Sequence, residues 1–523
     1  MESSNQLRRL FAAGYQLSPE AFSLLNSIEN SDEIIEQILS LKLDKVILSL
    51  DDVNKIIQQI MKEDDIEDHS SEQVTKKDES LIDESSSEKK VETKIKKHEE
   101  PSRTHIREEQ IASDLKVISS PEIKKTKISV DSFRRYFESR YDLISDFFTK
   151  RRDITNKVNT DYLHSLKTKE TVALIGIVTA KQKTRKGNII LELEDKVGSV
   201  TGLIMNSNTD LVQKAEFILE DSVLCFVGNW NKDLLRITDI FWPDIPFNHK
   251  PNHSYEEVLA LFISDIHIGS GNFAGELFLR VINFINGKLD SEKYNEVGKK
   301  IKYLFVGGDV VDGVGVYPGQ IDDLLLENIY LQYLLAAEYF EQIRSDVEII
   351  IIPGNHDGAR AAEPQTPIQR EFAPELYKLD NVHLLGSPSY LKAHNVEILM
   401  SHGNSIMDIN SAIPAIPHET SMPAMVEMLK NRHLVPIYGK RTSIVPDSVD
   451  QLVITRIPDI FQTGHTHIAG DEIYKGVTLI NSGTFQYQTI YQKNMNINPT
   501  TGVTYIINLK NIQRTRIDFN TIS

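Results

Sequence analysis

Five apolar runs in this chain each end in a short cluster of Asp, Asn, His and Gly residues. The clusters are Asp265-Ile266-His267, Gly308-Asp309, Gly354-Asn355-His356-Asp357, Ser401-His402-Gly403 and Gly464-His465-Thr466-His467, and they close the runs at 258–264, 301–307, 348–353, 396–401 and 459–463. Runs of this length and composition are typical of buried strands. In open α/β sheets, ligands bind where such strands end and loops begin. The pattern therefore predicts an α/β domain whose strand ends carry a functional site.

The residue types in these clusters predict two divalent metal ions. We assign Asp309 as the bridging carboxylate, Asp265, His267 and His467 to one ion, and Asn355, His402 and His465 to the other. Two carboxylates against two dications leave an excess of roughly two positive charges, which can bind a phosphate oxygen and lower the pKa of a bound water. Imidazole with carboxylate suits Mn, Fe or Zn better than Mg or Ca. Mn is the favoured ion, with Fe and Zn as alternatives.

His356 lies beside a predicted ligand without being needed as one. Its imidazole can donate a proton to a leaving oxygen or stabilise a transition-state phosphate, with Asp357 orienting the ring. These two residues are the predicted catalytic pair. Each cluster alone is weak evidence for a metal site, because a lone Gly-Asn-His-Asp or His-Gly can be a turn. All five in this order, each closing a strand, favour the metal site.

The five clusters resemble the pattern of the calcineurin-like metallophosphoesterases, which is D-x-H, G-D, G-N-H-[DE], a later His, and G-H-x-H. Wider segments at 307–320, 353–368, 428–439 and 496–502 resemble the small subunits of archaeal family D DNA polymerases. This resemblance implies a proofreading 3′–5′ exonuclease of a replicative polymerase, and every ligand of the family pattern is present. It also implies a large catalytic polymerase subunit as partner, because no polymerase signature occurs in this chain.

The expected architecture combines α/β and β domains. It is a calcineurin-like metallophosphoesterase α/β sandwich preceded by an OB-fold, with a helical N-terminal module on a disordered charged linker. The expected segments are a helical module at 1–60, the linker at 61–132, a connecting helical segment at 133–165, the OB-fold at 166–250 and the phosphoesterase domain at 251–523, with one long helix at 322–343. Residues 62–132 hold 33 charged residues and no aromatic one, so they cannot bury enough apolar surface to offset the ordering entropy. Short alternating strands over 170–245 with a basic first turn favour the OB-fold.

Basic residues near these elements are candidate DNA contacts. They are Lys181, Lys183, Arg185 and Lys186 in the first turn of the expected barrel, and Arg360, Arg432, Lys440 and Arg441 near the site and its insertion at 404–458. The barrel turn can meet the phosphates of a single strand or can be a solvated hairpin tip, and the sequence leaves both open. The insertion can cap the site or face a partner subunit. For 133–165, packing on the next domain is favoured over DNA contact.

Composition bounds the partners and the compartment. The net charge of −17 does not decide for or against DNA, because electrostatic effects depend on local patches. The one cysteine, Cys225, excludes an intrachain disulfide and a Cys-based zinc site. No run of 18 apolar residues occurs, and the polar start is not typical of a secretory signal. We expect a cytoplasmic protein that is nucleoid-associated during replication and has no membrane contact.

The expected partners are the large polymerase subunit and DNA with a single-stranded or mismatched 3′ end. A sliding clamp is a further candidate, although no clamp-binding peptide is evident. Two other functions stay open: a metal-dependent phosphatase acting on a monoester, and a non-catalytic polymerase accessory scaffold. The OB-like domain and the family-like segments argue against the phosphatase. The complete ligand set argues against a purely structural role.

Overall fold

The computed structural model describes residues 16–17, 24, 31–41, 47–48, 52–57, 112–122, 128–166 and 169–522. The chain divides into two compact units, Met1–Gln110 and Ile111–Ser523. Most of the expected linker lies outside the described residues. In the part of the chain that the structure describes, no helix is both long and apolar enough to cross a membrane.

The first unit mixes helix and strand. Its described elements are β1 (Gln16–Leu17), α3 (Ser31–Leu41), β2 (Ile47–Leu48) and a helical stretch at 52–57. Ile34, Ile35 and Ile38 are buried at helical spacing on α3. The expected module is all-helical, but β1 pairs in parallel with β2, and α3 supplies the crossover that a parallel pair requires. Apart from Leu24, the helices expected before residue 30 lie outside the described residues.

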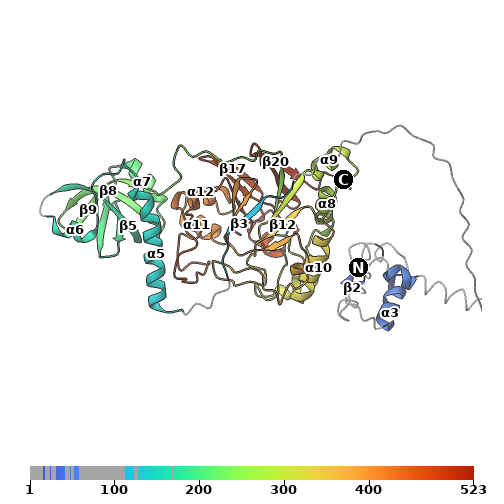
Figure 1. The fold of residues 1–523 in the computed structure, drawn as a ribbon. Helices are drawn as coiled ribbons and strands as arrows, with labels where there is room; N and C mark the ends of the chain where they lie inside the picture. Colours follow the sequence, from blue (N-terminus) through green and yellow to red (C-terminus); the bar gives the residue numbers. More distant parts are fainter. Residues whose placement is uncertain are drawn as a thin grey trace, which may run out of the picture. The chain divides into compact units, whose positions relative to one another are not determined.

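In the second unit, a closed barrel follows one long helix in the chain (Figure 1). Its elements are β4 (Lys157–Val158), α6 (Thr160–Ser165), β5 (Glu170–Lys183), β6 (Ile189–Glu194), β7 (Ser199–Ile204), α7 (Thr209–Glu216), β8 (Val223–Asn231) and β9 (Leu234–Phe241). The strand order is β4-β5-β6-β7-β9-β8, and β5 also pairs with β8, so five strands close on themselves. Leu174, Leu191 and Phe226 are among the side chains that fill the interior. The expected OB-fold is confirmed as a five-stranded, OB-like barrel.

Helix α5 (Val130–Thr149) precedes the barrel and packs along its length. Tyr136, Arg140, Ile144 and Phe148 are buried at four-residue spacing on one face. The Tyr141 hydroxyl donates to the barrel carbonyl of Ile175 at 3.1 Å. The Tyr136 hydroxyl donates to the Asp450 carboxylate at 2.7 Å. The helix therefore contacts both the barrel and the larger domain that follows.

Two six-stranded sheets form that larger domain. The first sheet contains β10 (Leu259–Ile263), β11 (Ile301–Val306), β12 (Glu348–Ile351), β13 (Val382–Leu384), β19 (Val503–Asn508) and β20 (Gln513–Asp518), and the second contains β3 (Leu115–Ser119), β14 (Ser389–Ala393), β15 (Val396–Met400), β16 (Ile460–Thr463), β17 (Gly470–Tyr474) and β18 (Val477–Asn481). Their orders are β13-β12-β11-β10-β19-β20 and β17-β18-β16-β15-β14-β3. Strands β10 to β13 run parallel, as do β15, β16 and β18. The five apolar runs of the sequence are β10, β11, β12, β15 and β16.

The two sheets pack face to face, and helices cover their outer faces. Ala260 and Phe262 of β10 pack with residues of the second sheet, whereas the alternate residue Leu261 packs with the helices. The covering helices are α8 (Gly275–Ile285), α9 (Glu292–Lys299) and α10 (Ile329–Glu341) on the first sheet, and α11 (Ile406–Ala412) and α12 (Met422–Asn431) on the second. Burial on both faces explains why these strands are continuously apolar rather than alternating. The expected metallophosphoesterase-like α/β sandwich is confirmed.

The prediction of a disordered linker up to residue 132 is wrong at β3. This strand pairs antiparallel with β14 at the edge of the second sheet. Leu115 packs against the core between the sheets, and Ile118 packs against the core on the outer face. Composition averaged over a charged segment does not reveal a five-residue strand whose backbone is satisfied by a neighbouring strand.

The helix predicted at 322–343 is shorter than expected. Helix α10 begins at Ile329, where the Asn328 side chain accepts hydrogen bonds from two backbone N–H groups of the first turn. The backbone N–H groups of Leu325 and Leu326 donate instead to the carbonyl of Gly269. The preceding residues therefore form a loop beside the ends of β10 and β11.

Candidate metal centre

Side chains from both sheets meet at the carboxyl ends of the parallel strands. Asp265, Asp309 and Asn355 follow β10, β11 and β12 of the first sheet. His402 follows β15 of the second sheet, and His465 and His467 follow β16. All seven predicted ligands therefore lie at the seam between the two sheets.

One half of the centre contains Asp265, His267 and His467. One ligand atom from each lies within 4.8 Å of the others. The two imidazole Nε2 atoms face each other at 3.0 Å, and His467 Nε2 lies 3.5 Å from Asp265 Oδ1. This is the grouping predicted for the first ion.

The other half contains His402, His465 and Asn355. Ligand atoms of His402, His465 and Asp309 lie within 4.8 Å of one another. His402 Nε2 lies 3.2 Å from both Asp309 Oδ2 and Asn355 Oδ1. Since Asp309 Oδ2 is also 3.8 Å from His267 Nε2, this carboxylate reaches both halves. That position suits the bridging role predicted for Asp309.

Hydrogen bonds on the outer side of the rings turn Nε2 toward the centre. His267 Nδ1 lies 2.9 Å from Asp312 Oδ1, and His402 Nδ1 lies 2.8 Å from the carbonyl oxygen of Gly307. The Gln492 amide lies 2.8 Å from His467 Nδ1. The oxygen acceptors at Nδ1 of His267 and His402 fix the tautomer that leaves Nε2 free to bind a metal, whereas Gln492 fixes only the orientation of the His467 ring. The donor set of carboxylate, imidazole and amide oxygen therefore fits two first-row dications.

Sequence reasoning missed two of these outer partners. Asp312 follows Asp309, the predicted bridging ligand, by three residues, and this proximity is a signal that could have suggested a role. Its carboxylate also accepts hydrogen bonds from Gln486 and Gln320. Gln492 lies 25 residues beyond His467 on α13 (Ile490–Asn494), and nothing in the sequence connects the two.

The protonation of the centre is coupled to its geometry. Burial, together with the Asp309 carboxylate and opposed by His402, raises the pKa of Asp265 to about 6. Burial also disfavours ionised Asp309, but the imidazole of His402 outweighs it and holds that pKa well below its usual range. Although burial disfavours protonated His402, Asp309 raises its pKa to about 10. Burial and His402 lower the pKa of His465 to about 3. Ligands bind metals deprotonated, so ion binding must release the His402 proton.

The ligand loops hold unusual backbone conformations. Asp265, His267, Asp309, His465 and His467 all have left-handed φ angles, between 51° and 70°. Each such non-glycine residue costs on the order of 1 kcal/mol or more, and such strain clusters at functional sites. The His465 N–H donates to both carboxylate oxygens of Asp265, at 3.0 Å each.

Glycine is required where two of these loops touch. A Cβ placed on Gly354 would lie 2.1 Å from Asp309 Oδ1, and one on Gly464 would lie 2.5 Å from Asp265 Oδ2. No side chain fits at those separations, so the glycines before Asn355 and His465 permit the close approach of the ligand loops.

His356 approaches the centre from one side. Its ring lies in a group with His267 and Asp309 whose ligand atoms are within 4.8 Å of one another. Its Nδ1 is 2.7 Å from the carbonyl oxygen of Asp312, so Nδ1 donates and Nε2 is left for a substrate. Burial lowers the pKa of His356.

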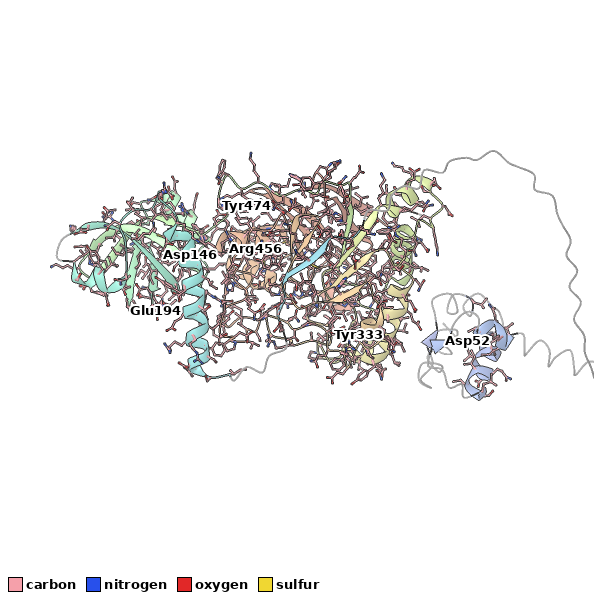
Figure 2. The ribbon with its side chains drawn as sticks, in the orientation of Figure 1. Asp52, Asp146, Glu194, Tyr333, Arg456 and Tyr474 are labelled. Carbon is pink, nitrogen blue, oxygen red and sulfur yellow. The ribbon has the colours of Figure 1, made fainter. Side chains whose placement is uncertain are left out.

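The prediction that Asp357 orients this ring is wrong. Its carboxylate accepts hydrogen bonds from the backbone N–H groups of Val310, Val311 and Gly354. It also accepts one at 2.9 Å from the hydroxyl of Tyr333, which is labelled on α10 in Figure 2. Asp357 therefore fixes the loops after β11 and β12, because their backbone donors would otherwise be buried without partners.

Two of the predicted DNA contacts are used inside the protein. Lys181 Nζ donates to three carbonyl oxygens at the end of α7, where helix carbonyls lack partners. Arg432 is 3% exposed, donates to carbonyl oxygens of Ile454 and Thr455, and stacks on the Phe147 ring. The prediction of DNA contact is therefore wrong for Lys181 and Arg432.

Of the other six candidate DNA contacts, one makes a hydrogen bond within the protein and five have exposed side chains. Arg360 donates to the carbonyl oxygen of Pro364 at 3.1 Å. Exposed side chains belong to Lys183, Arg185, Lys186, Lys440 and Arg441. The structure brings none of these five to the metal centre as a ligand.

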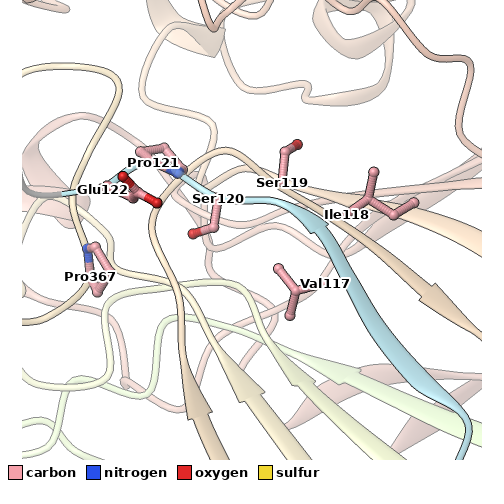
Figure 3. Close-up of a pocket in the computed structure, with 7 residues that line it drawn as sticks. All are labelled: Val117, Ile118, Ser119, Ser120, Pro121, Glu122 and Pro367. Atoms are coloured by element: carbon pink, nitrogen blue, oxygen red, sulfur yellow. The ribbon is translucent and has the colours of Figure 1, made fainter.

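A pocket of about 680 Å³ lies along the edge strand β3 (Figure 3). It is lined by Val117, Ile118, Ser119, Ser120, Pro121, Glu122 and Pro367. None of these residues belongs to the metal centre, so this pocket is not where the predicted chemistry occurs.

A sandwich of two sheets with an Asp/His/Asn centre at its strand ends defines the metallophosphoesterase-like class of proteins. The DNA polymerase alpha/epsilon B-subunit family matches residues 261–469. A solved structure of a novel archaeal phosphodiesterase covers 50% of this chain and 99% of that chain, at 14% identity and a TM-score of 0.26.

Sequence relatives identify one family within this class of proteins. The chain is 38% identical over 396 residues to the DNA polymerase II small subunit of Methanothermobacter thermautotrophicus, covering 76% of this chain and 81% of that protein. It is 36% identical over 400 residues to the DNA polymerase II small subunit of Pyrococcus abyssi, of which it spans 64%. The chain belongs to the family of archaeal DNA polymerase II, or family D, small subunits.

Proposed function

We propose that this chain is the 3′–5′ exonuclease subunit of a replicative DNA polymerase and removes mismatched 3′-terminal nucleotides. The observation that carries the proposal is the convergence of seven ligand residues and His356 at one point of the sandwich. The family supports DNA as the substrate. The name of the relatives, small subunit, supports a large catalytic polymerase subunit as partner and a scaffolding role beside the nuclease.

Hydrolysis at this centre would release the terminal nucleotide. Water adds to phosphorus, the bond to O3′ of the penultimate nucleotide breaks, that oxygen takes a proton, and a nucleoside 5′-monophosphate leaves. Two divalent ions, with Mn favoured, would offset the phosphate charge and lower the pKa of the attacking water. In this proposal His356 faces the leaving O3′ with Nε2, the ring nitrogen left free by the hydrogen bond between Nδ1 and the carbonyl oxygen of Asp312. Asp312 holds His267, and through its carbonyl also His356, in place.

Selectivity for mismatches follows from access. Asp265, His267, Asp309, His402 and His467 are buried, and Asn355 and His465 are half-buried, so a terminus must leave the duplex to reach them. Unpairing costs a few kcal/mol and costs least for a mismatched or single-stranded end. A frayed 3′ end is therefore the expected substrate.

The test is digestion of 5′-labelled single-stranded and 3′-mismatched DNA with Mn²⁺, comparing the wild type with Asp309→Ala. Products that shorten stepwise from the 3′ end, absent with the variant, would establish the nuclease. Phosphate release from a monoester without DNA cleavage would indicate a phosphatase. If neither substrate reacts, with or without the large subunit, the chain is a scaffold.

A further inference from the structure

The loop between β11 and α10 brings exposed apolar side chains to the edge of the metal centre. Val314 and Val316 are 41% and 37% exposed, in a segment that supplies no predicted ligand after Asp309. Tyr317 follows them, half-buried, with its ring centroid 6.3 Å from that of His356 and the rings inclined at 64°. Apolar side chains gathered on a surface commonly mark a binding site.

The loop is held in place at both ends. Gly313 exchanges two hydrogen bonds with the buried side chain of Gln332, at 2.8 and 3.1 Å. The Gln320 side chain accepts a hydrogen bond from the Val316 N–H and donates one to the carbonyl oxygen of Asp312.

The aromatic ring is fixed as well. The Tyr317 hydroxyl donates to Asp323 at 3.1 Å. The ring therefore has a defined position beside His356 before any substrate binds, and such preorganisation lowers the entropy cost of binding.

The position of Tyr317 relative to His356 identifies what it would meet. In the proposed function, His356 faces O3′ of the penultimate nucleotide, so a ring beside His356 faces that nucleotide. We infer that Tyr317 stacks on the base of the penultimate nucleotide, with Val314 and Val316 extending the apolar surface. This inference rests on the proposed exonuclease function.

Stacking suits an enzyme that must accept any sequence. Every base has a π-face, so aromatic side chains bind single strands without reading the sequence. A frayed penultimate base has lost its stacking partner in the duplex, and the Tyr317 ring replaces it. A substrate whose penultimate base is missing would lose this contact while keeping every phosphate.

The experiment measures kcat/KM for the first cleavage of three single-stranded DNAs with Mn²⁺. One is unmodified, one lacks the terminal base, and one lacks the penultimate base. The enzymes are full-length wild type, Tyr317→Ala, Tyr317→Phe and the control Tyr255→Ala. Tyr255 is 90% exposed and precedes β10, at the end opposite the centre and about 16 Å away along the strand.

With the wild type, loss of the penultimate base should reduce kcat/KM by about 10-fold, the scale of one base–aromatic stack. Tyr317→Ala should lose about 10-fold on unmodified DNA and show no further loss when the penultimate base is missing. Tyr317→Phe keeps the ring but loses the hydrogen bond to Asp323, so it should still lose activity when the penultimate base is missing. Tyr255→Ala should match the wild type on all three DNAs.

Two results would overturn the inference while the nuclease stands. One is a Tyr317→Ala enzyme that is slower by the same factor on all three DNAs, which would make Tyr317 only a support for His356. The other is a wild type indifferent to the penultimate base or sensitive only to the terminal one, a result that needs no variant to fold. Absence of cleavage of every DNA by the wild type, with or without the large subunit, would instead overturn the proposed function and this inference with it.

Discussion

The metal centre of the sandwich and the basic turn of the barrel both consist of polar residues that the sequence marks as functional. In the centre, buried side chains are positioned by hydrogen bonds such as that between His267 and Asp312. In the turn, Lys183 and Arg185 are exposed, and Lys181 is bound to the end of α7. A polar residue directly after a buried strand is therefore held in a defined position, whereas a run of basic residues does not by itself fix where each side chain lies.

The largest effect is expected from His465→Ala, which removes a predicted metal ligand. Loss of an outer-shell partner of a metal ligand typically costs about 10–100-fold, so loss of a ligand should cost more than 100-fold in DNA hydrolysis. The fold should persist, because His465 lies in a loop after β16 rather than in the core. Hydrolysis and ion content are measured beside the circular dichroism spectrum.

The matched control for that prediction is His383→Ala. His383 lies on the edge strand β13 and pairs with Glu348 outside the centre. Equal losses of activity in both variants, or loss of the native spectrum with His465→Ala, would show that position at the strand end is not what matters.

A buried ion pair joins helix α5 to the sandwich domain. Arg140 on α5 pairs with Asp450 at 2.9 Å, and both side chains are buried. Removing one partner of a buried ion pair leaves an uncompensated charge and typically costs about 3–5 kcal/mol. Asp450→Asn should lower the free energy of unfolding by about that amount in urea denaturation.

Asp142→Asn is the control on the same helix. Asp142 pairs with Lys196, and the two side chains are 57% and 46% exposed. Exposed pairs contribute about 0–1 kcal/mol, so this variant should unfold almost as the wild type does. Equal changes in the free energy of unfolding for Asp450→Asn and Asp142→Asn would show that the buried ion pair contributes no more than the exposed one.

The stability of the fold should also depend on pH, through His433 beside Asp450. His433 donates from Nε2 to Asp450 and accepts at Nδ1 from the Val435 N–H, so it is neutral in the fold. Burial, together with the charge of Arg140, lowers its pKa to about 4. Between pH 6.5 and 4 the unfolded chain therefore binds a proton that the folded chain excludes, and stability falls as pH falls. From pH 6.5 to 5 the loss is about 2 kcal/mol.

His433→Gln should remove this part of the acid sensitivity. The thermal midpoints of wild type and variant are compared at pH 7.0 and 5.0. The wild type should lose more on acidification, and parallel shifts in the two proteins would mean that other groups cause the effect.

The smallest expected effect concerns the basic turn. Replacing Lys183, Arg185 and Lys186 together with Ala should weaken binding to single-stranded DNA by less than about 10-fold at low salt and leave kcat unchanged. An effect of this size corresponds to one phosphate contact, whose loss should lower the slope of log K against log salt by about 0.7.

A second triple variant, Lys288→Ala with Lys293→Ala and Lys299→Ala, removes the same charge from the α8–α9 region. An identical change in both triple variants would mean that net charge, and not the turn, contributes to binding.

The strand ends were predictable because both faces of β10, β11 and β16 are buried, which leaves long apolar runs that stop where the ligands begin. The residue types at the strand ends predicted a metal site, and the resemblance to the metallophosphoesterase pattern supported the set of ligands. The role of Asp357 was not predictable, because its partners are backbone groups brought close by the fold. Nor was the ordering of β3, because the composition of the charged segment around it hides a five-residue strand that pairs with β14.

The seven ligands divide between two separate sheets, and this division has a consequence for assembly. Ions bound at the seam would brace the first sheet against the second, so only a correctly docked pair of sheets could hold them. By mass action, ion binding then favours the fully assembled sandwich over forms in which each sheet is built but not yet aligned. The ions that the proposed nuclease requires would thus also favour the mature fold.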